Sequence, residues 1–167
     1  MFYKDWAFSS FEEMKYLRPD HPTLHDFYFV SKQDIPKTVS IFARAFLHNP
    51  MFVYLIPDDE NRKENISYIF EYIVRFGFNH GKIVATSESL EGISIWLNSQ
   101  NMQETLFRQV RAGGLKILWN LGLKFLKQQQ TLNSAVKKTH EKSAEKMKGE
   151  HLYLSSLCVD PNQQGKG

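Results

Sequence analysis

The stretch HLYLSSLCVDPNQQGKG, residues 151–167, decides the fold. Residues 152–159 are strand formers with a near-continuous apolar character, which predicts a central strand that is buried on both faces. Pro161 cannot donate to a strand ladder and holds Asp160 extended, so the strand should end there. The glycines that follow let the backbone approach a ligand closely. The segment therefore predicts a buried strand that leads into an anion-binding turn.

The turn has the chemistry of an anion nest, yet it matches neither of two familiar phosphate motifs. Successive free N–H groups in such a turn bind anions, and Lys166 would add a point charge. A Walker A loop needs Gly-x-x-x-x-Gly-Lys-Ser/Thr, which the chain lacks. The dinucleotide fingerprint Gly-x-Gly-x-x-Gly would start closer to the end of the strand. We therefore expect an anionic small molecule that is held in another way.

The elements before this segment predict a mixed α/β domain. Apolar spacing and capping residues predict, in chain order, a strand at 27–30, a helix from Ser31 or Asp34 to His48, a loop at 51–57, a helix from Asp58–Asp59 to Gly81, and a hairpin of strands at 82–87 and 92–97. The expected order up to this point is βααββ.

Residues 101–148 read as a helical insertion between the hairpin and the central strand. Breaks are expected at Gly113–Gly114, near Gly122 and near Gln128–Gln130. The middle of the insertion, residues 115–126, is apolar on most sides with interspersed lysines. It suits either a membrane surface or a helix packed on the core or along a substrate cleft. We favour packing, because the polar face is narrow.

Composition limits the class of protein. The chain has 167 residues with 42% hydrophobic content, enough for one domain with a sizeable core, and residues 1–26 are expected to be an N-terminal extension that packs on it. A formal charge of +3 is too small to indicate a nucleic-acid partner. No apolar run is long enough to cross a bilayer, so we expect no membrane partner. One cysteine and no leader-like start indicate a reducing, cytoplasmic setting. The oligomeric state, a homo-oligomer included, is left open.

The segment resembles the acyl-CoA-binding motif of the Gcn5-related N-acetyltransferase (GNAT) family, Val-x-Pro-x-x-Gln/Arg-Gly-x-Gly-x-Gly/Ala. The residues that match it in register are Val159, Pro161, Gln164, Gly165 and Gly167. The βααββ order before a buried strand is also the order of that family. Residues 45–50 and 92–96 are similar to its branch that acetylates small amines and antibiotics such as puromycin. The resemblance implies one GNAT domain over residues 1–167.

The resemblance implies acetyl-CoA as acetyl donor and an amine of a small molecule or peptide as acceptor. In this family the backbone around Leu157 and Val159 pairs with the pantetheine arm as an added strand would, and the glycine turn wraps the pyrophosphate. Donor contacts carry over onto Leu157, Cys158, Val159, Gln164, Gly165, Lys166 and Gly167. The alternative is a catalytically inactive acyl-CoA-binding sensor or an interaction module of the same fold.

One departure from the family is large. The family continues beyond the motif with a helix, further strands and another helix, and the last glycine or alanine of the motif does not follow Gly167. We therefore expect the sequence to be incomplete relative to the natural protein, with the C-terminal part of the fold absent. The fragment alone should be a poor enzyme.

No side chain is singled out as the catalytic base. Glu150, His151 and Tyr153 are the nearest titratable or hydroxyl groups in sequence, but none has a spacing that marks it. Cys158, alone in an apolar strand, is expected to be a small buried core residue without a covalent role. His21 and His25 are separated by a proline and lack further ligands, so we expect no metal.

Aromatic residues offer one hypothesis about the acceptor. Trp96, Phe52 and Tyr54 would suit the wall of an acceptor pocket, since such clefts are commonly lined by aromatic side chains. Ordinary packing is the more frequent role of aromatic residues beside a core, and we favour it.

Overall fold

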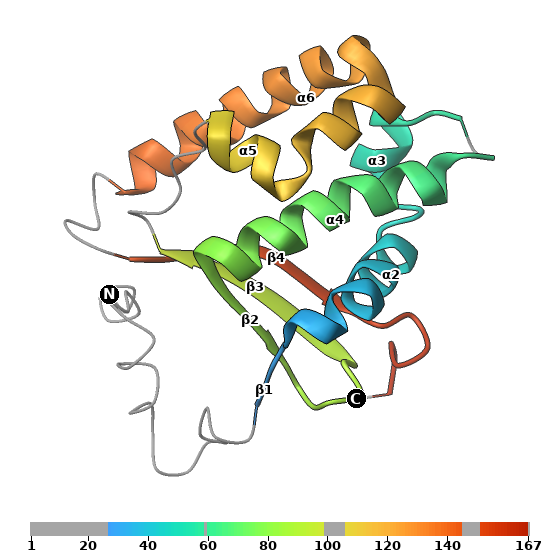
Figure 1. Ribbon diagram of the computed structural model, residues 1–167, viewed down its shortest axis with the longest axis vertical. Coiled ribbons are helices and arrows are strands. Elements are labelled where there is room, and N and C mark those ends of the chain that lie inside the picture. The colour runs from blue at the N-terminus through green and yellow to red at the C-terminus, as the bar shows by residue number, and fades with distance from the viewer. Residues whose placement is uncertain (1–26, 59, 99–105, 145–150, 167) are drawn as a thin grey trace.

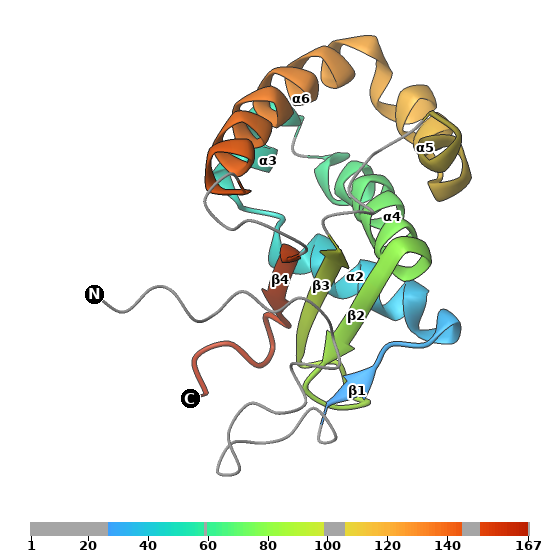
Figure 2. The same cartoon turned by 90° about the vertical axis from the view of Figure 1, so that its left-hand side faces the viewer.

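The computed structural model describes residues 27–58, 60–98, 106–144 and 151–166. They form a four-stranded antiparallel sheet with helices stacked in two layers on one of its faces (Figure 1 and Figure 2). The strands, in spatial and chain order, are β1 (Tyr28–Phe29), β2 (Gly81–Ala85), β3 (Gly92–Asn98) and β4 (Leu152–Val159). The chain is therefore mixed α/β, as predicted.

The inner helical layer lies directly on the sheet. It contains η2 (Lys32–Asp34), α2 (Ile35–Ala45) and α4 (Arg62–His80), whereas the short helix α3 (Pro50–Leu55) lies further from the sheet, beside α6 (Gly114–Ala144) (Figure 1 and Figure 2). Both predicted N-cap residues stand at a helix start, Ser31 before η2 and Asp34 before α2, and the Asp34 carboxylate accepts from the Ser31 N–H and not from an N–H of α2. Gly81 ends α4, as predicted. α3 replaces the predicted loop at 51–57 because the Asn49 side chain accepts a hydrogen bond from the Met51 N–H and Pro50 suits the first helical position.

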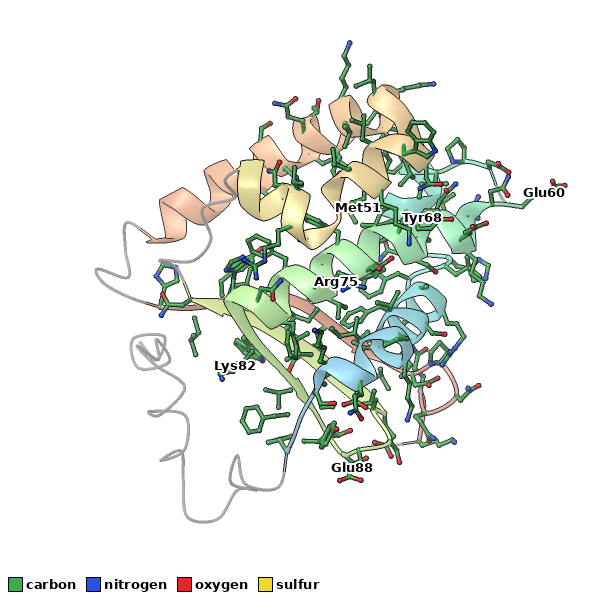
Figure 3. All side chains as sticks on the ribbon, viewed as in Figure 1. Met51, Glu60, Tyr68, Arg75, Lys82 and Glu88 are labelled. Atoms are coloured by element: carbon green, nitrogen blue, oxygen red, sulfur yellow. The ribbon has the colours of Figure 1, made fainter. Side chains whose placement is uncertain are left out.

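The core lies between the sheet and this inner layer. Phe42 of α2 and Phe70 of α4 stack with ring centroids 4.9 Å apart, and both are almost completely buried. From below, β3 contributes Ile93 and Ile95, which alternate with half-buried residues on the other face of the sheet. The tip of the β2–β3 hairpin, marked by Glu88 in Figure 3, projects away from the helices.

The outer helical layer packs on α4. It contains α5 (Leu106–Ala112) and α6 (Gly114–Ala144), and Figure 2 shows α6 bending over the inner helices. Two predicted breaks are confirmed, because Gly113 has φ 103° between the two helices and Gly122 has φ 73° within α6. The break predicted at Gln128–Gln130 is wrong: α6 continues through it, since glutamine is a good helix former.

The prediction of a central, doubly buried strand is corrected by β4. In the described part of the sheet β4 lies at the edge and pairs with β3 alone. Leu154, Leu157 and Val159 are 38%, 59% and 42% exposed, and within the strand only Cys158 is buried. The reason is that both helical layers lie on one face, so the apolar residues on the opposite face of β4 have no described helix over them.

Several predictions concern residues outside the described part of the chain. They are the N-terminal extension 1–26, the two ends of the insertion at 101–105 and 145–148, and the site residues Glu150 and Gly167. Among the helices that the structure describes, none combines the length and apolar character needed to span a lipid bilayer.

Candidate functional site

The candidate site begins at the outer edge of β4. The Asp160 N–H donates to the Glu91 carbonyl oxygen at 2.7 Å, so the backbone of Asp160 faces β3. Backbone groups alternate in direction along an antiparallel strand, so those of Cys158 also face β3, whereas those of Leu157 and Val159 point to the open edge. This edge therefore presents backbone donors and acceptors that a ligand can pair with.

A bulge lies in the same strand. Ile95 pairs with Ser156 but its neighbour Trp96 pairs with Leu154, which leaves Ser155 as an extra residue in β4. A bulge bends its strand and increases the local twist, and bulges are common beside active sites. Here it changes the direction of β4 before the strand reaches the open-edge residues.

The turn that follows β4 is closed by its own hydrogen bonds. The Asp160 carboxylate accepts from the Asn162 N–H at 3.0 Å, and the Asp160 carbonyl accepts from the Gln163 N–H at 2.7 Å. Gly165 has φ 74°, a left-handed conformation that favours glycine. No atom lies within 4 Å of the position that a Cβ would take there, so the backbone is open to a ligand.

Two side chains of the turn are held by hydrogen bonds. Gln164 donates from Nε2 to the Val159 carbonyl oxygen at 3.0 Å, which links the turn to the open edge of β4. Lys166 donates from Nζ to Oε1 of Gln163 at 3.0 Å, so its charge is held beside the turn. The predicted contact residues Val159, Gln164, Gly165 and Lys166 therefore form one continuous surface, and all are exposed.

An ion pair joins this turn to the inner helical layer. Nη2 of Arg44, in the last turn of α2, lies 2.7 Å from Oδ2 of Asp160. The Arg44 Nη1 also donates to the Ser40 hydroxyl oxygen at 3.1 Å. Sequence reasoning missed this pair because the two residues are 116 positions apart and no motif relates them. The pair fixes where the turn sits and offsets the negative charge of Asp160.

Cys158 faces the core rather than the ligand edge. Burial, with a smaller effect of the Asp160 charge, raises the pKa of its thiol to about 12. The thiol is therefore protonated at neutral pH, and a protonated thiol is a poor nucleophile. Cys158 is thus the buried core residue that the sequence predicts.

The weak candidates for a catalytic base lie at the other end of β4. His151 is buried just before the strand, and Tyr153 pairs with Leu97 near its start. At about 3.3 Å per residue, Tyr153 is roughly 20 Å from Val159 along the strand. The structure therefore does not bring His151 or Tyr153 to the turn, and Glu150 lies outside the described residues.

The three aromatic residues considered for an acceptor pocket do not gather. Phe52 is buried and packs against Phe70, with ring centroids 5.5 Å apart. Tyr54 is 64% exposed on α3. Trp96 donates from its indole N–H to the Ser94 hydroxyl oxygen at 2.9 Å on the face of β3 turned away from the helices. Packing is thus the observed role of Phe52.

A cavity elsewhere in the molecule is separate from this site. It has a volume of about 230 Å³ and lies at the β1 side of the sheet, on the opposite edge from β4; its lining residues are Phe29, Val30, Phe78, Gly81, Lys82 and Ile83. Within the described ranges, no three His, Cys, Asp or Glu side chains come together in a way that could hold a metal ion.

Comparison with known proteins adds no relative. No protein-family model matches the chain, and no curated protein sequence matches it. The functional proposal therefore depends on the residues and the geometry of β4 and its turn.

Proposed function

We propose that this chain binds acetyl-CoA along the outer edge of β4 and transfers the acetyl group to an amine, as GNAT enzymes do. The observation that carries the proposal is the continuity of the open backbone at Leu157 and Val159 with the left-handed turn at Gly165. These are the positions at which the sequence motif expects pantetheine and pyrophosphate. The mixed α/β sheet, with η2, α2, α3 and α4 between β1 and β2, is compatible with the same family.

The open edge suits the pantetheine arm. Pantetheine carries two amide groups, and each can pair with strand backbone in the way that an added strand does. Val159 offers both its N–H and its carbonyl at this edge. The carbonyl already accepts from Gln164, but it has a second lone pair for a ligand donor.

The turn suits a pyrophosphate. Its residues are exposed, Gly165 leaves room for close approach, and Lys166 supplies a positive charge. The carboxylate of Asp160 would repel an anion, but the Arg44 guanidinium 2.7 Å away offsets that charge. Without Arg44 the turn would hold an uncompensated negative charge next to the ligand.

The chemistry is acyl transfer between sulfur and nitrogen. Acetyl-CoA supplies an acetyl thioester: the amine nitrogen attacks its carbonyl carbon, the C–N bond forms, the C–S bond breaks, and the proton lost by nitrogen balances the one taken up by the thiolate. The Leu157 N–H also points to the open edge, further from the turn than Val159, and can donate to the carbonyl oxygen as negative charge develops there. We assign no general base.

The absence of an assigned base leaves an alternative function. A protein that binds acyl-CoA without transferring the acetyl group would fit the same backbone site at the open edge of β4. Such a protein would use the turn and the open edge as a sensor uses them. Binding and thiol release distinguish the two functions.

The test of binding compares two glycines with positive φ. Gly165 and Gly122 have φ 74° and 73°, and neither has an atom within 4 Å of a built Cβ. Gly165→Ala and Gly122→Ala should therefore both strain the backbone, at a cost of about 1 kcal/mol or more, without a steric clash inside the chain. Calorimetry with acetyl-CoA should show affinity about ten-fold weaker for Gly165→Ala only, because that methyl group meets the pyrophosphate.

The outcomes separate the functions. Acetyl-CoA binding with thiol release in a panel of amines supports the transferase, and binding without thiol release supports the sensor. Absence of acetyl-CoA binding, or an equal effect of both alanine substitutions, would count against any acyl-CoA site at β4.

A further inference from the structure

The first arm of α6, defined here as residues 114–127 on both sides of the kink at Gly122, carries apolar side chains that no described residue covers. The opposite face packs inward, since Ile117 and Phe125 are buried in the core. The exposed side chains are Leu115, Leu118, Trp119 and Leu123, with 60%, 37%, 89% and 68% of their surface accessible. Residues 115, 118 and 119 share one side of a helix because they are three and four positions apart. The sequence-based prediction that this segment packs on the core thus holds for its inward side chains. It does not account for the apolar side chains that point outward.

The sequence around this arm is basic and contains no acidic residue. Between Thr105 and His140 the sequence contains seven lysines and arginines and no aspartate or glutamate. These 36 residues carry a formal charge of +7, whereas the whole chain carries +3, so the remainder carries −4. A local excess of this size selects for an anionic surface.

The lysines of the first arm have different roles. Lys116 binds the Glu71 carboxylate at 2.7 Å and lies 4.8 Å from the centre of the Tyr68 ring, which anchors α6 on α4. Figure 3 shows Tyr68 on the side of α4 that faces α6. Lys124 and Lys127, by contrast, are exposed and follow Leu123 by one and four positions. Their long aliphatic stems can lie along apolar surface while the ammonium groups reach anionic groups.

We propose that this arm of α6 lies on the surface of an anionic lipid membrane. Trp119, Leu115 and Leu123 enter the boundary between headgroups and acyl chains, where tryptophan is preferred, and Lys124 and Lys127 contact the anionic headgroups. The association is peripheral, consistent with the absence of a spanning helix among the described residues. The proposal departs from the sequence expectation of no membrane partner, and it is independent of the acyl-CoA site.

A second copy of the chain fits this face less well. A symmetric dimer buries the same patch of both subunits, so it would bring two acid-free basic segments together. Like charges at close range disfavour that arrangement, whereas an anionic bilayer satisfies the charge and the apolar face together.

The experiment is sedimentation of the full chain with vesicles. We expect binding to vesicles of phosphatidylcholine with phosphatidylserine, weaker binding to phosphatidylcholine alone, and loss of binding at high salt because the charges are screened. Trp119→Ser and Leu123→Ser should each weaken binding about ten-fold. Lys124→Gln and Lys127→Gln should each weaken it about five-fold.

A matched control is Phe29→Ser on β1. Phe29 is a large apolar residue that is 48% exposed and lies in another part of the molecule, so its loss should leave vesicle binding unchanged. All five variants alter exposed side chains, and circular dichroism verifies that they fold. The proposal is overturned by no binding to anionic vesicles, by equal binding to neutral ones, or by binding that Trp119→Ser leaves intact. A dimer in solution that Trp119→Ser dissociates would also overturn it, in favour of self-association.

Discussion

The inner and outer helical layers use apolar residues in opposite ways. In α4 the inward stripe is completely covered, with Ile66, Phe70 and Val74 at most 2% exposed. In α6 the inward residue Ile117 is covered, but Trp119 two positions later is 89% exposed. A soluble helix usually carries one apolar stripe, so α6 has more apolar surface than its contacts with α4 use. The inner layer provides stability, and the outer layer also provides a surface.

The largest predicted effect is a difference in the free energy of unfolding between a substitution in the inner layer and one in the outer layer. Phe70→Ala leaves a cavity beside Phe42 and should lower the free energy of unfolding by about 3–5 kcal/mol. Trp119→Ala removes a larger side chain but an exposed one, so the change should stay within about 0.5 kcal/mol. Urea denaturation followed by circular dichroism measures both. Similar losses would show that the outer face of α6 is covered in solution.

The next effect tests whether the inner layer controls the turn. Arg44→Met removes the guanidinium that pairs with Asp160, so the turn loses this constraint. Acetyl-CoA binding must then also order the turn, which costs conformational entropy. We expect acetyl-CoA affinity to fall about ten-fold and amide exchange at Asn162 and Gln163 to become faster. Arg75→Met is the control, since it breaks the Arg75–Glu71 ion pair of α4. Unchanged amide exchange in Arg44→Met would show that Arg44 does not hold the turn in place, and this result can be read even if the chain binds no acyl-CoA.

A smaller effect compares two threonines, one in each layer. The Thr38 hydroxyl on α2 is buried and has no hydrogen-bond partner among the described residues. Thr38→Val should therefore stabilise the chain by about 1 kcal/mol, because an unsatisfied polar group becomes a methyl group. The exposed Thr131 of α6 donates to the Lys127 carbonyl at 3.1 Å, so Thr131→Val should bring no gain. Thermal unfolding of both variants checks this, and destabilisation by Thr38→Val would mean that its hydroxyl is satisfied.

The smallest effect concerns the contact between the layers. Hydrogen bonds from Lys116, and less strongly from Arg75, lower the pKa of the Glu71 carboxyl. A lowered pKa in the folded chain contributes stability above the pKa of the unfolded chain, and that contribution is lost as pH falls through the folded value. Glu71→Gln should remove a few tenths of a kcal/mol of the stability difference between pH 7 and about pH 3. Glu88→Gln, at the tip of the hairpin, is the control, and an identical pH profile for Glu71→Gln and the parent chain would contradict the prediction.

Local features of the fold could be predicted from the sequence. The caps Ser31 and Asp34, the stop at Gly81 and the breaks at Gly113 and Gly122 depend on residues close in the chain, and the structure confirms them. The helix at 50–55 was missed although its signal was present: an asparagine followed by proline starts a helix as readily as it ends one.

Long-range features could not be predicted in this way. The continuous apolar sequence of β4 indicated that both faces of the strand are buried. Burial depends on which elements cover each face, however, and the described helices cover only one face of the sheet. The motif located the open-edge residue Val159 and the turn residue Gly165, but the Arg44–Asp160 pair joins segments that no local pattern relates. The exposed face of α6 was ambiguous for the same reason, since apolar residues on most sides do not specify which of them meet α4.

The register at the start of β4 has a consequence for the whole molecule. Asn98, the last residue of β3, pairs with Leu152, the first of β4, so the segment between them leaves and re-enters the sheet at points about 5 Å apart. Closing a longer loop costs little, about 0.6 kcal/mol for each doubling of its length. A chain built in this way can change the length of the connections at either end of the outer layer without moving the turn at the opposite end of β4. The proposed membrane face of α6 can therefore vary independently of the proposed acyl-CoA site.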